Sequence, residues 1–105
     1  MDKSYVVNCV RSFAEKVARE LEVSQVILFG SYAKGTANAD SDIDVAVVTS
    51  SPVRDWLETS ARLYRLGGDI NLFIEPILLD LKTDRSGCLE EIRKTGEVIY
   101  DRECV

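Results

Sequence analysis

The chain has 105 residues and contains no histidine. Histidine is the side chain whose ordinary pKa lies nearest physiological pH, so its absence excludes His-based acid–base chemistry and activation of a nucleophile by His. Cysteine is scarce too: Cys9, Cys88 and Cys104 are odd in number and far apart. This pattern predicts neither a disulfide framework nor a zinc site. We expect Cys9 to be a small buried core residue and Cys104 to be an incidental thiol.

The sequence also lacks a long apolar run and an excess of basic residues. No stretch approaches the roughly 18 apolar residues of a membrane span, and no signal peptide is recognisable. We therefore expect a cytoplasmic protein without a membrane partner. Thirteen Lys and Arg against 18 Asp and Glu give a net charge of −5. Surfaces that bind nucleic acid are basic, so we expect no nucleic-acid partner and favour a metal-neutralised small substrate or a protein partner.

Hydrophobic periodicity predicts a single α/β domain over residues 1–105. Apolar residues at helical spacing predict a first helix over residues 4–21, capped by Ser4. A second helix is expected to open at Pro52 and to stop at Gly67-Gly68, with Trp56 and Tyr64 in its core. A third is expected over residues 86–95, closed by Gly96.

Strands are expected over residues 26–29, 42–48, 69–79 and 97–100. The order is then helix, strand, turn, strand, helix, strand, helix, strand. It predicts a mixed sheet of about four strands with helices packed on it. The small size and exposed edges of such a domain are compatible with a homodimer or a hetero-oligomer.

The segment GSYAKGTANADSDIDVAVV follows the first strand and contains the most informative residues. Gly30 and Ser31 come where the strand passes into a turn, and this combination suits close approach of a phosphate to the backbone. Lys34 is a candidate phosphate contact one turn later. Asp42 and Asp44 are two residues apart on the next strand, so both side chains leave the same face. Carboxylates paired in this way suit Mg²⁺ together with substrate phosphates.

Two other motifs fail in this segment. A P-loop requires Lys after its second glycine, and Thr36 follows Gly35. An EF-hand beginning at Asn38 requires Gly at position 43 and Glu at position 49, where the chain has Ile43 and Thr49. The loop is therefore neither of these known sites. Tyr32, which lies in it, is a candidate to stack on a nucleobase.

Two-metal transfer chemistry commonly uses a third carboxylate. The third predicted strand has Asp69, Asn71 and Glu75 on one face. Asp69 is our candidate if the strand brings it beside Asp44, whereas Glu75 is expected to be exposed. Asn71 cannot act as a base. The identity of the third acid therefore stays open.

The Gly-Ser to Asp-x-Asp segment resembles the signature of the polymerase β-like nucleotidyltransferase superfamily. The short chain and the ten-residue gap resemble its minimal nucleotidyltransferase (MNT) family, and the order of elements extends the likeness over most of the chain. The resemblance implies a polymerase β-type palm. It also implies that Gly30 and Ser31 bind the triphosphate, that Lys34 stands where Arg is common, and that Asp42 and Asp44 bind Mg²⁺.

The family's third acid lies inside a strand between two apolar residues, and this pattern falls here on Asn71. The resemblance implies transfer of a nucleoside monophosphate, AMP from ATP, to a hydroxyl acceptor. The acceptor would be a side chain of a partner protein, as in pairs of a HEPN toxin and an MNT antitoxin. A nucleotide- or toxin-binding antitoxin module with weak or no catalysis is the alternative, which Asn71 favours. Modification of an aminoglycoside ranks lower, because it usually requires a further domain.

Overall fold

The computed structural model describes residues 2–37, 41–50, 53–80 and 87–102. The predicted order of elements is confirmed, with the turn after the first strand forming a short helix. The elements are α1 (Lys3–Glu20), β1 (Val23–Phe29), α2 (Ser31–Lys34), β2 (Ile43–Thr49), α3 (Trp56–Gly68), β3 (Ile74–Asp80), α4 (Cys88–Thr95) and β4 (Glu97–Asp101). None of the helices in these ranges is long and apolar enough to cross a membrane.

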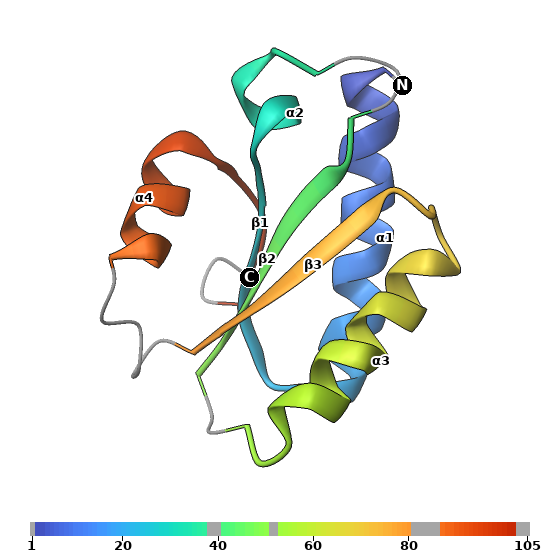
Figure 1. Ribbon diagram of the computed structural model, residues 1–105, viewed down its shortest axis with the longest axis vertical. Coiled ribbons are helices and arrows are strands. Elements are labelled where there is room, and N and C mark those ends of the chain that lie inside the picture. The colour runs from blue at the N-terminus through green and yellow to red at the C-terminus, as the bar shows by residue number, and fades with distance from the viewer. Residues whose placement is uncertain (1, 38–40, 51–52, 81–86, 103–105) are drawn as a thin grey trace.

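The four strands form one mixed sheet in the order β3-β2-β1-β4. β1 is antiparallel to both β2 and β4, and β2 is parallel to β3. Figure 1 shows α1 and α3 on one side of the sheet and α4 on the other. The mixed sheet predicted from the sequence is therefore confirmed, and the beginnings of β2 and β3 lie at the same end of it.

The main core lies between the sheet and the helices α1 and α3. Val6, Val10, Phe13 and Val17 of α1 are completely buried, which accounts for the helical spacing in the sequence. A smaller cluster lies under α4 on the other face and contains Ile27, Ala46, Val48, Leu89 and Ile92. Burial on both faces explains why the central strands are continuous apolar runs. Cys9 is buried, as predicted.

Polar side chains fix α4 and β4 to the sheet. Gln25 of β1 donates from Nε2 to Asp101 Oδ2 at 3.0 Å, and its Oε1 accepts from Arg93 Nε at 2.9 Å. One amide thereby joins the central strand to β4 and to α4.

The predicted helix starts were partly wrong. α1 is capped by Asp2, whose Oδ1 accepts from Ser4 N at 3.4 Å, so Ser4 is inside the first turn. α3 is capped by Asp55, which accepts from Glu58 N at 2.9 Å. Pro52, the predicted start of this helix, lies outside the described residues. In both helices a carboxylate satisfies an N–H that has no partner within the helix.

The predicted end of the second long helix at Gly67-Gly68 is confirmed, but the predicted start of the third strand at residue 69 was wrong. α3 ends at Gly68, and β3 begins only at Ile74. Residues 69–73 form turns in which Ile70 N and Asn71 N donate to the Gly67 carbonyl. Gly67 is buried, and a Cβ built on it would lie 2.9 Å from Ile74 Cγ2. Gly67 therefore permits close packing of α3 on β3.

The two adjacent glycines allow a matched prediction about stability. Gly67→Ala is expected to destabilise the fold by about 1–3 kcal/mol, because the added methyl overlaps a buried side chain, and this exceeds the helix-propensity gain of about 1 kcal/mol. Gly68→Ala is expected to stabilise it by about 0.5–1 kcal/mol, since the nearest atom to its Cβ would be 3.9 Å away. Urea unfolding of both variants measures the difference. Equal effects of the two substitutions would contradict this account of Gly67.

The aromatic residues differ from expectation. Trp56 and Tyr64 were predicted to be core residues of the helix, yet their exposed fractions are 45% and 53%. Tyr32, expected in an open loop, is buried in the main core. Tyr32 therefore packs α2 onto the domain and is not free to stack on a base.

Pro76 occupies the middle of β3, which is an edge strand. Ile43 N of β2 donates to the Phe73 carbonyl at 2.8 Å. Along a β-strand, every second residue directs its N–H and C=O groups to the same neighbouring strand. Phe73, Glu75 and Ile77 consequently direct their backbone groups towards β2. Pro76 faces the outer edge, where its missing N–H removes no bond from the sheet.

Candidate active site

The Gly-Ser turn and the aspartate pair meet where β1 ends and β2 begins. Phe29 is the partner of Asp44 in the antiparallel pair, so Gly30 lies next to the Asp44 side chain. Gly30 has φ +76°, and a Cβ built there would overlap the Asp44 carboxylate. Both the backbone angle and the space therefore require glycine at position 30. The structure brings together the two halves of the sequence motif.

α2 follows at once as a single helical turn. Ser31 is its first residue, and the Ser31 carbonyl accepts from Gly35 N and from Thr36 N. Gly35 ends the turn with a left-handed conformation at φ +77°. Lys34 is exposed on this turn. Gly30, Ser31 and Lys34 thus lie on one short connection that begins beside Asp44.

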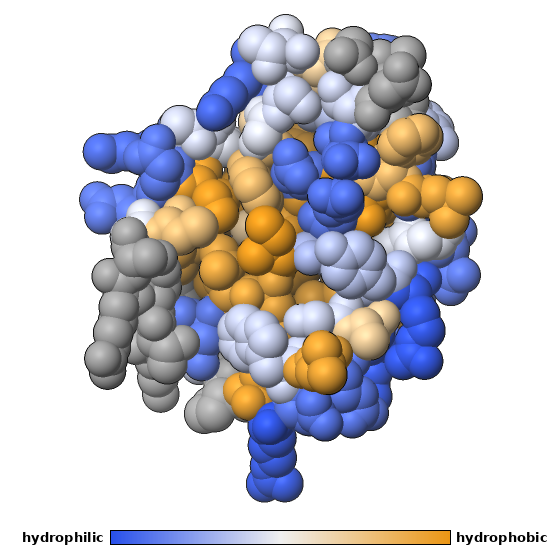
Figure 2. Space-filling view, in the orientation of Figure 1, coloured by the Kyte–Doolittle hydropathy of each residue, from blue (hydrophilic) through white to orange (hydrophobic). Residues whose placement is uncertain are grey.

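Asp42 and Asp44 flank the buried Ile43 at the beginning of β2. Asp42 is exposed and Asp44 is half-buried. Val45 and Val47 point into the main core, whereas Ala46 and Val48 lie in the cluster under α4. Alternation along the strand places Asp44 on the second of these faces, where α4 leaves the beginning of β2 uncovered. Figure 2 shows hydrophilic side chains gathered where β2 and β3 begin, above an apolar area between α4 and α3.

The residue opposite Asp44 on β3 is Glu75. Because the two strands are parallel and in register, both side chains leave the same face of the sheet. Glu75 hydrogen-bonds Asp42, and the negative charge of Asp42 is the main reason that the pKa of Glu75 is raised. Burial, followed by the charge of Asp42, also raises the pKa of Asp44. Asp42, Asp44 and Glu75 therefore form a group of crowded carboxylates, which we call the acidic triad.

Asp69, our sequence candidate for the third acid, lies elsewhere. It is the C-cap residue of α3, five positions before β3 begins, and has no strand partner. Asn71 also precedes the strand, and its Oδ1 accepts from Phe73 N at 2.9 Å. The expectation that the third strand would bring Asp69 beside Asp44 is thus corrected. Glu75 is exposed, as predicted, and it is the residue that lies opposite Asp44.

Glu75 was recognisable in the sequence from its neighbours. It stands between Ile74 and Pro76, both buried, which is the pattern of an acid between two apolar residues. The same pattern at Ile70 and Leu72 drew attention to Asn71. Pro76 made the true segment look less like a strand, although proline is tolerated on an edge.

The acidic triad makes stability depend on pH. A carboxyl whose pKa is higher in the folded state than in the unfolded chain favours folding when protonated, so this stabilisation is lost as pH rises above the ordinary values of 3.8 and 4.5. We expect the Asp44→Asn/Glu75→Gln double variant to melt above the wild type at neutral pH without metal. The difference should shrink on acidification towards those values. Thermal melts between neutral pH and about pH 4 measure the difference in melting temperature between the two proteins. A difference that does not change with pH would contradict the repulsion among the three carboxylates.

The donor set of the acidic triad fits a hard divalent cation. Asp and Glu oxygens are the ligands of Mg²⁺, and a cation relieves the repulsion that raises the pKa of Glu75 and adds to the effect of burial on the pKa of Asp44. Within the described ranges, no three acidic or thiol side chains are grouped closely enough to hold one metal ion by themselves. A metal at the triad would therefore bind one or two carboxylates and complete its shell with water or phosphate oxygens, as Mg²⁺ commonly does.

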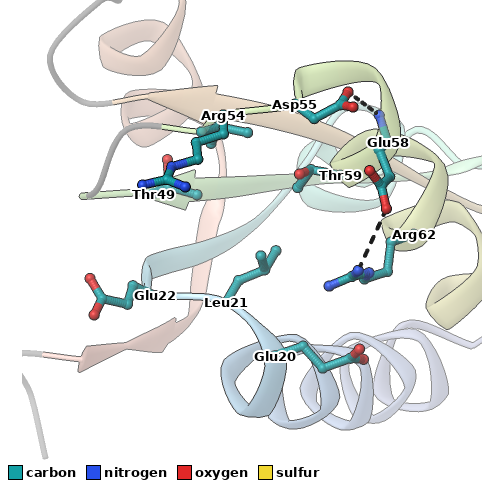
Figure 3. Close-up of a pocket in the computed structure, with 10 residues that line it drawn as sticks. Glu20, Leu21, Glu22, Thr49, Arg54, Asp55, Glu58, Thr59 and Arg62 are labelled. Carbon is teal, nitrogen blue, oxygen red and sulfur yellow. Dashed lines mark hydrogen bonds and ion pairs between the residues drawn. The ribbon is translucent and has the colours of Figure 1, made fainter.

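A hollow lies at the end of the sheet opposite the acidic triad. It measures about 340 Å³ and is lined by the end of α1, Thr49 at the end of β2, and the first turns of α3. Figure 3 shows Asp55 capping Glu58 N, and Arg62 paired with Glu58 at 3.9 Å. Thr49 is five residues from Asp44, roughly 17 Å along the strand. The hollow is therefore separate from the acidic triad.

Comparison with known proteins gives a family match along most of the chain. Residues 12–104 match the family model described as polymerase beta, nucleotidyltransferase. The provisionally named protein adenylyltransferase MJ1305 of Methanocaldococcus jannaschii is 30% identical, with 98% of this chain and 77% of that protein covered. A second such protein from the same organism, MJ0141, is 29% identical, covering 87% of this chain and 95% of the relative.

Solved structures share the fold at low sequence identity. A provisionally named nucleotidyltransferase from Sulfolobus solfataricus superposes with a TM-score of 0.73 at 22% identity, covering 96% of this chain and 85% of the other. A chain from the complex of tri-AMPylated Shewanella oneidensis HEPN toxin with MNT antitoxin gives a TM-score of 0.59 at 17% identity, covering 98% and 76%. The α/β fold predicted from the sequence is thus confirmed as that of polymerase β-like nucleotidyltransferases.

Proposed function

This chain belongs to the polymerase β nucleotidyltransferase family and is a nucleotidyltransferase, and on that premise we propose that it transfers AMP from ATP, with Mg²⁺, to a hydroxyl group of a partner protein. The observation that carries the proposal is the meeting of Gly30 with Asp44 and of Asp44 with Glu75. A phosphate-binding turn and a row of three carboxylates there share one end of the sheet.

The turn and the aspartates would bind the substrate. The backbone at Gly30 and the Ser31 hydroxyl and N–H are positioned to hold the β- and γ-phosphates, with Lys34 as an additional charge. Asp42 and Asp44 would hold Mg²⁺, which supplies compensation for the charge on the phosphates when bound. Gly30 keeps the turn against Asp44, so the triphosphate and the carboxylates lie side by side.

Glu75 is proposed as the proton acceptor. The acceptor hydroxyl attacks the α-phosphorus, its proton passes to a Glu75 carboxylate oxygen, and pyrophosphate leaves as the new phosphate ester forms. Glu75 is opposite Asp44 on the sheet, so its carboxylate lies beside the two aspartates and can accept a proton there. Its exposure leaves it accessible to a large acceptor.

A protein acceptor is supported by the relatives. The two proteins from Methanocaldococcus jannaschii carry the name protein adenylyltransferase, and one structural neighbour comes from a complex containing an AMPylated HEPN toxin. We propose a HEPN-type partner in a toxin–antitoxin pair for this chain. The alternative of a binding module without catalysis was based on Asn71. That reason lapses, because Asn71 lies in a turn and Glu75 stands in the strand.

The proposal is tested by incubating the purified chain with ATP, Mg²⁺ and the protein encoded beside it, and by reading the intact mass of that protein. We expect the mass to increase by whole AMP units and the adduct to map to a hydroxyl side chain. Omission of Mg²⁺ is the control and should leave the mass unchanged. A folded complex that binds ATP but yields no adduct would refute transfer to this partner.

A further inference from the structure

Two exposed apolar side chains flank Glu75 along the edge of the sheet. Phe73 comes two residues before Glu75 and Ile77 two residues after it, and their exposed fractions are 40% and 42%. Glu75 and Ile77 alternate with the core residues of β3, so both side chains leave the face of the sheet that carries the acidic triad. The bond from Ile43 N to the Phe73 carbonyl continues this alternation to Phe73. Phe73, Glu75 and Ile77, which we call the β3 row, therefore place apolar surface on both sides of a carboxylate.

The strand order arranges the parts of the proposed site in a line across the sheet. Gly30 follows β1, Asp44 lies on β2, and Glu75 lies on the edge strand β3. Neighbouring strands are about 4.8 Å apart, so the phosphate-binding turn and Glu75 lie on opposite sides of Asp44, roughly 10 Å from each other. This order determines the side from which each reactant approaches Asp44.

The geometry of the transfer then gives the acceptor one direction of entry. In an in-line displacement the attacking and the leaving oxygens are on opposite sides of the phosphorus. With the β- and γ-phosphates at the turn of Gly30 and Ser31, pyrophosphate leaves on the β1 side, and the acceptor hydroxyl enters across β3. Helix α4 covers the β1 side of this face, where Leu89 and Ile92 pack in one cluster with Ile27. The edge strand is on the other side, so the acceptor meets the β3 row.

We propose that Phe73 and Ile77 are the docking surface for the acceptor protein, and that the acceptor hydroxyl belongs to a residue with apolar neighbours on both sides. This inference rests on the proposed function and adds to it the chemistry of the acceptor segment. Each of the two side chains is two strand residues from Glu75, about 6.6 Å along the strand. Residues three or four positions apart on a helix have a similar separation, about 5–6 Å. Apolar side chains at this spacing before and after the acceptor residue would contact Phe73 and Ile77 when its hydroxyl reaches Glu75.

The chemistry of the β3 row favours an apolar acceptor segment over a charged one. The side chains of Phe73 and Ile77 offer no hydrogen-bond partner, so burying a charged neighbour against them would cost free energy. Covering them with apolar groups removes their exposed area from water, and aromatic residues are enriched in protein interfaces. The same contact keeps water away from the reacting hydroxyl, and water would otherwise compete with it as the acceptor.

The double variant Phe73→Ser/Ile77→Thr tests the proposal, with the protein encoded beside this chain as the acceptor. The KM for the acceptor, and its Kd measured by calorimetry without ATP, should both rise at least tenfold. The affinity for ATP with Mg²⁺ should stay within twofold of the wild type. Ile77→Thr alone keeps a β-branched side chain on the strand and should raise both acceptor constants at least threefold, so the test does not depend on the double variant being folded.

Val98→Thr is the matched control. Val98 is 43% exposed, and it lies opposite Ile27 on the face that carries the acidic triad, but on β4 at the far edge of the sheet. Because the acceptor enters across β3, Val98→Thr should leave the acceptor constants within twofold of the wild type. Thermal melts of all the variants compare their stability.

Three results would overturn the proposal. The first is an acceptor affinity within twofold of the wild type in folded Ile77→Thr and in the double variant. The second is a loss of ATP affinity as large as the loss of acceptor affinity, since the β3 row would then bind the nucleotide. The third is a dimeric wild type that becomes monomeric in the double variant by sedimentation, since a second copy would then cover the row.

Failure of AMP transfer is a separate outcome. If the acceptor binds through Phe73 and Ile77 but gains no AMP, the proposed function fails and the docking surface remains. If the double variant transfers AMP with an unchanged KM for the acceptor, the proposed function holds and the docking surface is wrong.

Discussion

Asp44→Asn is expected to reduce AMP transfer by about a thousandfold or more, and to abolish the Mg²⁺-dependent part of ATP binding. Asp44 is the carboxylate that lies against Gly30 and opposite Glu75, so its loss removes a proposed metal ligand at the centre of the site. Compensation of phosphate charge by a metal is among the largest contributions to this kind of catalysis. Calorimetric titration with ATP, in Mg²⁺ and in EDTA, measures the binding, and single-turnover assays measure the transfer.

We expect Asp44→Asn to remain folded, so unfolding should not account for its loss of AMP transfer and ATP binding. Burial and a neighbouring charge raise the pKa of Asp44, so an uncharged amide of the same shape relieves the apo protein of a strained carboxylate. The melting temperature of Asp44→Asn without metal should equal or exceed that of the wild type. If Asp44→Asn bound ATP with an unchanged dependence on Mg²⁺, the metal would lie elsewhere and the proposed site would be wrong.

Glu75→Gln is expected to lower the rate of AMP transfer by about 10²–10⁴-fold while leaving ATP affinity within a few-fold of the wild type. The amide keeps the shape of the side chain but cannot accept the proton of the acceptor hydroxyl. The rate of the wild type should fall as pH is lowered and the Glu75 carboxylate is protonated, and the variant should lack this fall. Rapid-quench measurements over pH with saturating ATP separate the rate from the affinity.

Asp69→Asn is the matched control for Glu75→Gln, because Asp69 was the third acid suggested by the sequence. At the C-cap of α3 its carboxylate is exposed and has no partner on the sheet, so its substitution should change the rate less than twofold. The reverse result, in which Asp69→Asn is inactive and Glu75→Gln is active, would return the role of base to Asp69.

The sequence was informative where local periodicity and burial agree. The stripe Val6, Val10, Phe13 and Val17 predicted α1, and the continuous apolar runs predicted the central strands, because these features depend on neighbouring residues alone. The sequence also predicted that Gly30-Ser31 and the pair Asp42 and Asp44 form one site, because all four residues belong to one short segment. The antiparallel register of β1 and β2 then brings the two ends of that segment together.

Glu75 was missed because its role depends on a contact between strands 31 residues apart in the sequence. The third strand begins at Ile74, five residues later than predicted, because residues 69–73 form turns after α3. The alternation at Ile70 and Leu72 belongs to a turn, so the predicted strand began too early. Non-local register of this kind cannot be read from apolar spacing alone.

Pro76 limits how any other polypeptide can approach β3. Of the outward N–H groups on this edge, the one at Ile74 already donates to the Asn71 carbonyl, and Pro76 has none. An extended peptide that tried to extend the sheet would find its ladder interrupted beside Glu75. The proposed acceptor protein is therefore not expected to present its hydroxyl on a strand added to this edge. The same proline also opposes aggregation through pairing of the β3 edges of two molecules.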